Sequence, residues 1–99
     1  MRKTIFNWLG HEFIELSGEA VPGTDAGSEA GDLFQRFDRE LHAHGLSLDN
    51  TVRSRLWGRD RASRDAGSTE RVNILSGKAR SASSSYIAPG HFDAPAKIA

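Results

Sequence analysis

The chain has 99 residues, the size of one small domain, and we take residues 1–99 as a single domain. Its 13 basic and 13 acidic side chains give a net charge of zero, which argues against a general attraction to nucleic acid or to membrane surfaces. There is no cysteine, which excludes disulfides and thiolate sites, and no apolar run approaches the roughly 20 residues of a membrane helix.

The N-terminal part predicts a β-hairpin followed by a loop. Residues 5–8 and 12–16 are rich in β-branched and aromatic side chains and are separated by Gly10, which favours two antiparallel strands. Residues 18–31 are rich in glycine and indicate a loop. The N-terminus lacks the long apolar stretch and cleavage site of a signal peptide, so we expect a cytoplasmic protein.

An amphipathic helix is predicted next. Either Ser28 or Asp32 can cap its start, and Gly45 can end it. The apolar residues that fall on one face at helical spacing are Leu33, Phe34, Phe37 and Leu41.

The second half predicts three further strands around a weaker helix. The strands are expected at residues 51–57, 79–87 and 94–99, the helix at 68–75, and a turn at Pro89-Gly90. The large apolar residues of this helix are Val72, Ile74 and Leu75. The resulting order, β-β-α-β-α-β-β, predicts an α+β fold in which two helices cover one face of a sheet. The other face must then meet water or another subunit.

Arg80 stands at the head of a run of small and hydroxyl side chains. A guanidinium offers a fixed fork of donors that matches a carboxylate, and the hydroxyls of Ser84 and Tyr86 lie further along the same run. From the pattern alone two interpretations stay open: a solvated arginine at a strand end, or a carboxylate site.

Other groups of charged and polar residues give weaker indications of function. A basic run from Arg53 to Arg64 could contact RNA, but Asp60 and Asp65 lie in and beside it, so we favour a salt-bridged surface. His42 and His44 are two residues apart and do not share a helix face. With no metal-binding or catalytic motif, we expect no metal and no cofactor, and the spacing names no catalytic residue.

Three segments, in this order, resemble the Rid family, which is also called YjgF or L-PSP. They are FIELSGEAVPG (13–23), LFQRFDRELHAHGLSLDNTVRSRLWGRD (33–60) and KARSASSSYIAPG (78–90), which includes an Ala-Arg-Ser element at 79–81. The order and spacing of the segments carry the resemblance. The resemblance implies a chorismate-mutase-like α+β fold. It also implies a homotrimer in which the open sheet faces form a central barrel, with ligand clefts between subunits.

The resemblance further implies a small-molecule carboxylate as the ligand, held by Arg80. Family members hydrolyse 2-imino or enamine acids to 2-keto acids and ammonia. On this hypothesis the backbone near Ser17 and Gly18, or around Arg80, polarises the reacting atom, and the hydroxyl of Ser84 or Tyr86 orients a water molecule.

The sequence departs from the family at positions that matter for chemistry. The glutamate of the last strand in deaminating members falls near Ala94, and the usual cysteine two residues after the arginine is Ala82. The last strand is also short. Two functions therefore stay open: a Rid-like hydrolase or deaminase, and a non-catalytic, ligand-binding or accessory subunit of a hetero-oligomer, in which a second chain completes the last strand.

Overall fold

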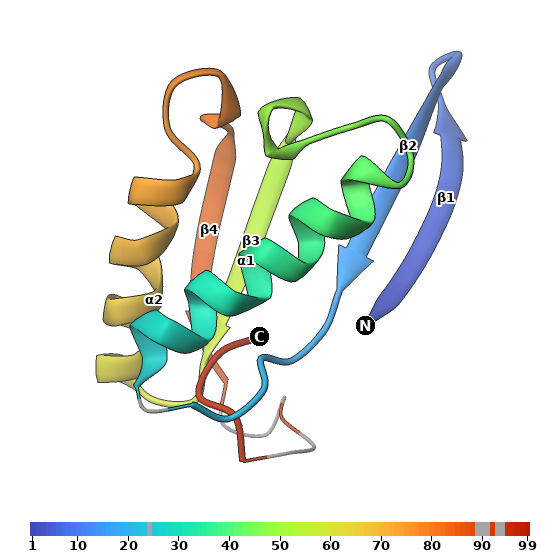
Figure 1. Cartoon of the computed structure of the whole chain (residues 1–99). Helices are drawn as coiled ribbons and strands as arrows, with labels where there is room; N and C mark the ends of the chain where they lie inside the picture. The colour runs from blue at the N-terminus through green and yellow to red at the C-terminus, as the bar shows by residue number, and fades with distance from the viewer. Residues whose placement is uncertain (24, 89–91, 93–94) are drawn as a thin grey trace.

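The computed structural model describes residues 1–23, 25–88, 92 and 95–99, and within them the strands form one layer that two helices cover (Figure 1). In chain order the elements are β1 (Arg2–Trp8), β2 (His11–Ser17), α1 (Ala26–His42), the 3₁₀-helix η1 (Leu48–Asn50), β3 (Arg53–Gly58), α2 (Arg61–Ile74), the 3₁₀-helix η2 (Gly77–Ala79) and β4 (Ala82–Ile87). Both α-helices lie on the same side of the strands, as the predicted α+β class requires.

The strand layer consists of two hydrogen-bonded pairs. β1 and β2 form the predicted antiparallel hairpin, in which Trp8 pairs with His11 across Leu9 and Gly10. Both turn residues have positive φ, 52° and 79°, as the tightest hairpin turns require. β3 and β4 pair in parallel, connected through α2. No ladder joins β2 to β3 among the described residues, so the expected single sheet is divided into two pairs.

Helix α1 starts earlier than the sequence pattern indicates. The side chain of Asp25 caps it by accepting a hydrogen bond from the Ser28 backbone N–H at 2.8 Å. The predicted caps at Ser28 and Asp32 are therefore wrong, and so is the assignment of residues 26–31 to a loop. Buried Ala26 and Ala30 extend the apolar face by two turns, and this packing outweighs the glycines between them.

Helix α2 also starts earlier than predicted, at Arg61 rather than Ser68. Asp60 caps it by accepting from the Ser63 backbone N–H at 2.8 Å. Its buried face consists of two small residues and a cation: Ser63, Gly67 and Arg71. Val72, one of the apolar residues on which the prediction rested, is 70% exposed.

The C-terminal part differs from the predicted strands. β4 begins at Ala82 rather than Ala79, because η2 intervenes and Arg80 is its C-cap residue. In place of a strand over 94–99, Ile98 forms a single antiparallel bridge with Gly58. The predicted turn at Pro89-Gly90 and the residue Ala94 lie outside the described residues.

The buried core lies where the terminal segment meets α1, α2 and the end of β3. Its residues are Ala20, Ala26, Ala30, Leu33, Leu56, Ala96 and Ile98. A Cβ at Gly58 would lie 2.5 Å from the backbone of Arg64, so only glycine allows α2 to approach β3 this closely. Neither α-helix of the described residues has the length and hydropathy needed to cross a bilayer.

Candidate functional site

Arg80 lies directly after η2, at the end of the layer where β4 begins. Its side chain is exposed, and among the described residues the guanidinium has no hydrogen-bond or ion-pair partner. The hydroxyl oxygen of the neighbouring Ser81 is buried, and within the described part of the chain it has no hydrogen-bond partner. Because the Ser81 oxygen is buried, the exposed Arg80 guanidinium is the group of this pair that can donate to an anion from solvent.

Ser84 and Tyr86, the predicted water-orienting residues, lie together on β4. The Tyr86 hydroxyl donates to Ser84 Oγ at 3.4 Å, and the Tyr86 ring stacks on Trp57 with ring centroids 5.6 Å apart. β4 begins at Ala82, so Ser84 and Tyr86 lie within the strand and Arg80 lies before it.

Ser17 and Gly18 lie at the opposite end of the layer from Arg80. β2 runs away from its hairpin turn and ends at Ser17, whereas η2 and the start of β4 lie at the end where β3 begins (Figure 1). A single chain does not bring Arg80 and Ser17-Gly18 together. A site that uses both must combine two copies of the chain.

The sheet face that the helices leave uncovered is rich in aromatic residues. Lys3 contacts Glu40 of α1, so the alternate residues Phe6 and Trp8 of β1 point away from the helices. Phe6 and Trp8 are 41% and 62% exposed, and each ring contacts Phe13 of β2. Exposed apolar surface of this kind is typical of protein–protein contacts.

Arg71 is a polar residue of this region that the sequence pattern did not reveal. It is 7% exposed on the buried face of α2, and its Nη1 donates to the backbone carbonyl of Ser84 at 2.7 Å. Burial lowers the pKa of the guanidinium from its ordinary value. Arg71 lies four residues after Gly67 and so shares its buried face. The sequence predicts this position only if the helix is known to start at Arg61. Arg71 thus holds β4 against α2.

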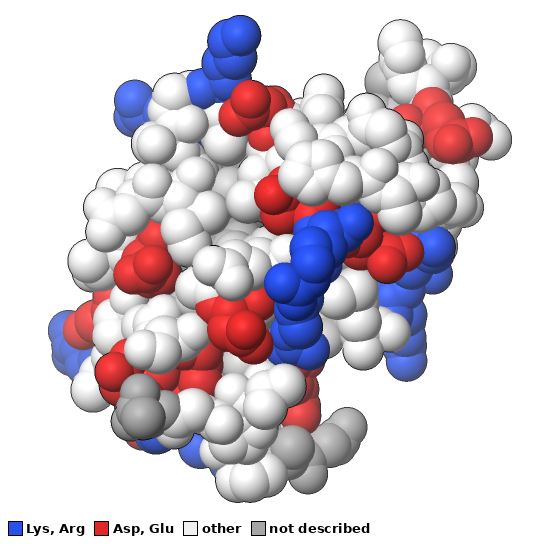
Figure 2. Space-filling view, in the orientation of Figure 1, with Lys and Arg blue, Asp and Glu red and all other residues white. Residues whose placement is uncertain are grey.

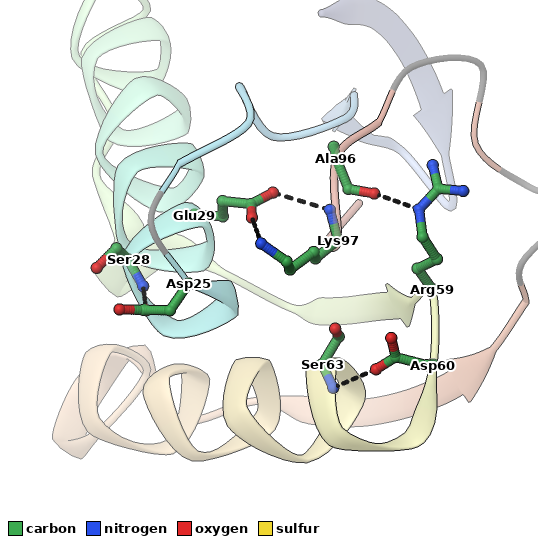
Figure 3. Close-up of polar contacts among 8 residues, drawn as sticks. All are labelled: Asp25, Ser28, Glu29, Arg59, Asp60, Ser63, Ala96 and Lys97. Atoms are coloured by element: carbon green, nitrogen blue, oxygen red, sulfur yellow. Dashed lines mark hydrogen bonds and ion pairs between the residues drawn. The ribbon is translucent and has the colours of Figure 1, made fainter.

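Polar contacts hold the C-terminal segment at Ala96 and Lys97 (Figure 3). Glu29 of α1 is 1% exposed; its Oε1 accepts from the Lys97 backbone N–H at 2.8 Å, and its Oε2 lies 3.6 Å from Lys97 Nζ. Arg59 Nε donates to the Ala96 carbonyl at 2.7 Å. The buried carboxylate therefore has a structural partner in the same chain.

A hollow of about 260 Å³ lies between the starts of α1 and α2. It is lined by Asp25, Ala26, Ala62, Ser63, Ala66 and Lys97. The two helix starts are occupied by their own caps, Asp25 and Asp60, and the Ser63 backbone N–H lowers the pKa of Asp60. These groups satisfy one another, so the hollow is a weaker candidate than Arg80.

The charged side chains of the described residues neither cluster as metal ligands nor gather by sign on the helix-covered face (Figure 2). Within the described residues, no three His, Asp or Glu side chains come together. On the helix-covered face, Lys and Arg alternate with Asp and Glu, without a continuous basic patch (Figure 2).

Comparison with known proteins supports the fold. No family model and no curated protein matches the chain. Among the solved structures, the chain is similar to the crystal structure of Rv2704 from Mycobacterium tuberculosis, described as a member of the highly conserved YjgF/YER057c/UK114 family. The TM-score is 0.75 at 21% identity, over 86% of this chain and 71% of that chain. The predicted chorismate-mutase-like α+β fold is thereby confirmed.

Proposed function

We propose that this chain is a divergent member of the YjgF (Rid) family and that it binds a small carboxylate through Arg80. The observation that carries the proposal is the exposed guanidinium of Arg80, which has no hydrogen-bond or ion-pair partner among the described residues. The fold of Rv2704 and the Ala-Arg-Ser element at residues 79–81 support it, because both point to the same family.

The proposed site lies between copies of the chain, in a homotrimer. Two observations favour this assembly. Arg80 and Ser17-Gly18 lie at opposite ends of one strand layer, and the uncovered face carries exposed Phe6 and Trp8. Packing these faces together would bury the aromatic residues and bring the β2 end of one copy toward Arg80 of another.

The proposed reaction is hydrolysis of an imino or enamine acid. Arg80 holds the substrate carboxylate in a two-pronged contact. For the imine, water adds to the carbon of the C=N bond, and the resulting carbinolamine expels ammonia to leave a 2-keto acid. Backbone N–H groups near Ser17 and Gly18 would stabilise the charge that develops on the reacting group. No side chain is assigned as the catalytic acid or base.

Substitution of Arg80 tests this proposal. Arg80→Ala should weaken the binding of a 2-keto acid such as pyruvate, measured by calorimetric titration, by about tenfold to a hundredfold, the size of a lost charged hydrogen bond. Arg80→Lys keeps the positive charge but not the two-pronged donor geometry, so its affinity for the keto acid should fall less. The rate at which keto acid is released from freshly generated imine should likewise fall more in Arg80→Ala than in Arg80→Lys. Unchanged binding and turnover in Arg80→Ala would overturn the proposal.

A second candidate is a non-catalytic, accessory subunit of a hetero-oligomer. The break in the strand layer between β2 and β3 favours it, because another chain could complete the layer there. Keto-acid release from imine by the purified chain alone, lost in Arg80→Ala, would contradict this candidate.

A further inference from the structure

Three basic residues lie at the end of the strand layer where β3 and β4 begin, and we call them the basic cluster. Lys78 belongs to η2, Arg80 follows it as the C-cap residue, and Arg53 is the first residue of β3. The two parallel strands begin at the same end, where Arg53 pairs with Ala82, two residues beyond Arg80 (Figure 1). η1 contacts η2 here, so the segments that precede the two strands also pack together.

The side chains of the basic cluster have no partner in the part of the chain that the structure describes. All three residues are exposed, and none of their side chains forms a hydrogen bond or an ion pair with a described residue. Asp49, the acidic residue of η1, is also exposed and forms no ion pair with them. The cluster therefore presents charged donors to solvent and to any ligand that approaches this end of the layer.

Basic side chains elsewhere in the described residues are paired or stand singly. Five of them form ion pairs: Lys3–Glu40, Arg36–Asp32, Arg55–Glu15, Arg64–Asp65 and Lys97–Glu29. The other arginines that lack a partner, Arg2, Arg39 and Arg61, each stand on a different element, β1, α1 and α2. The whole chain has equal numbers of acidic and basic residues, so the gathering of unpaired basic side chains in the cluster is a local feature.

The chemistry of the cluster suits a ligand with more than one negative group. One carboxylate occupies the guanidinium fork of Arg80, which leaves Arg53 and Lys78 for a second group. Arg53 offers another fork that matches a carboxylate, and Lys78 adds a compact charge on a flexible stem. Charge of one sign on a short stretch of surface attracts a dianion more strongly than a monoanion, because each added charge contact strengthens binding.

We propose that the basic cluster selects a ligand with two carboxylates, a 2-keto or 2-imino dicarboxylic acid. This inference rests on the proposed function, in which Arg80 holds the carboxylate beside the reacting carbon. Arg53 and Lys78 hold the distal carboxylate and thereby determine which acid binds. They touch neither the imine carbon nor the attacking water, so they act in specificity and not in the chemical step.

Calorimetric titration with two keto acids tests the proposal. 2-Oxoglutarate carries two carboxylates, whereas 2-oxopentanoate has the same carbon chain and only the carboxylate beside the keto group. We expect 2-oxoglutarate to bind about tenfold more tightly at low ionic strength, the size of one hydrogen bond to a charged group. Added salt should reduce this preference, because salt screens exposed charges. Equal affinities for the two keto acids overturn the inference and leave the carboxylate proposal standing.

Single substitutions locate the source of the preference. Arg53→Gln and Lys78→Gln should each lower the ratio of the two affinities by about threefold, the size of an exposed charge contact. Arg80→Ala should instead weaken the binding of both keto acids. Arg61→Gln is the matched control, because it removes an exposed arginine without a described partner that lies beyond the opposite end of β3. Its affinity ratio should equal that of the parent.

The outcomes separate this inference from the proposed function. If neither keto acid binds, the carboxylate proposal fails and the inference fails with it. If 2-oxoglutarate is preferred but the preference survives in both Arg53→Gln and Lys78→Gln, the basic cluster does not select the ligand. A ratio that falls equally in Arg61→Gln also overturns the inference, because the preference then comes from the charge of the whole chain.

Discussion

Two regions of the molecule differ in burial, and we call them the closed end, around residues 96–99, and the open end, the strand β1. At the closed end, where residues 96–99 lie, Ala96, Ile98 and Glu29 are at most 1% exposed. At the open end, every residue of β1 is exposed. Hydrophobic stabilisation follows buried area, so the closed end contributes more of the folding free energy than the exposed strand β1 does.

The largest difference between the ends should appear when one isoleucine from each is shortened. Ile98→Ala removes the largest fully buried apolar side chain and should lower the free energy of unfolding by about 2 to 5 kcal/mol. Ile5→Ala removes the same atoms from a side chain that is 49% exposed, and should cost less than about 1 kcal/mol. Urea unfolding measures both, and equal losses would contradict the comparison.

Glycine substitution tests the close packing of the closed end. In Gly58→Ala the new Cβ would lie 2.5 Å from the Arg64 backbone, which cannot move without displacing α2. We expect a loss of about 1 to 3 kcal/mol in the free energy of unfolding.

Gly31→Ala is the control for this substitution. Its Cβ would meet only the flexible end of Glu70, at 3.4 Å, inside helix α1. Alanine is the better helix former, so we expect stabilisation of up to about 1 kcal/mol in urea unfolding. A Gly58→Ala protein as stable as the parent would show that α2 is not packed tightly against β3.

Substitution of two glutamates compares the stability contributed by a buried polar contact with that of an exposed one. Glu29→Ala leaves the buried Lys97 N–H without its acceptor and should cost about 1 to 2 kcal/mol, whereas Glu29→Gln keeps an acceptor and should cost less. Glu15→Ala removes only the exposed pair with Arg55 and should cost less than about 1 kcal/mol. If Glu15→Ala loses more free energy of unfolding than Glu29→Ala, by thermal or urea unfolding, then Glu29 does not hold the C-terminal segment.

The sequence predicted elements whose signals are local. The hairpin follows from residues around Gly10, and the apolar spacing from Leu33 to Leu41 predicts the body of α1. The starts of both helices were missed because tertiary packing decides them. Small residues such as Ala26 and Gly67 carry the buried faces there, and apolar periodicity does not detect them.

The candidate site could be predicted only in part. Arg80 was identified by its own chemistry and by resemblance, but its place outside β4 depends on η2. Arg71 became visible only through packing against β4, where it meets the carbonyl of Ser84. The division of the strand layer into two pairs has no sequence signal, because it arises from how the pairs are placed side by side.

The smallest effect concerns the contact that fastens the open end to α1. Lys3 Nζ donates to Glu40 Oε1 at 2.9 Å, and this hydrogen bond is the main cause that lowers the pKa of Glu40. Because the folded pKa is depressed, its stabilisation is present above the usual glutamate pKa of about 4.3 and is lost as the pH falls through the folded pKa.

Glu40→Gln should therefore lower the urea midpoint slightly at neutral pH, and the difference from the parent should vanish in acid. Lys3→Met added to Glu40→Gln should cost little more, since both remove one exposed interaction. A difference that stays constant from neutral to acid pH would mean that the charge of Glu40 does not hold the hairpin. The open end would then depend on its apolar contacts with α1.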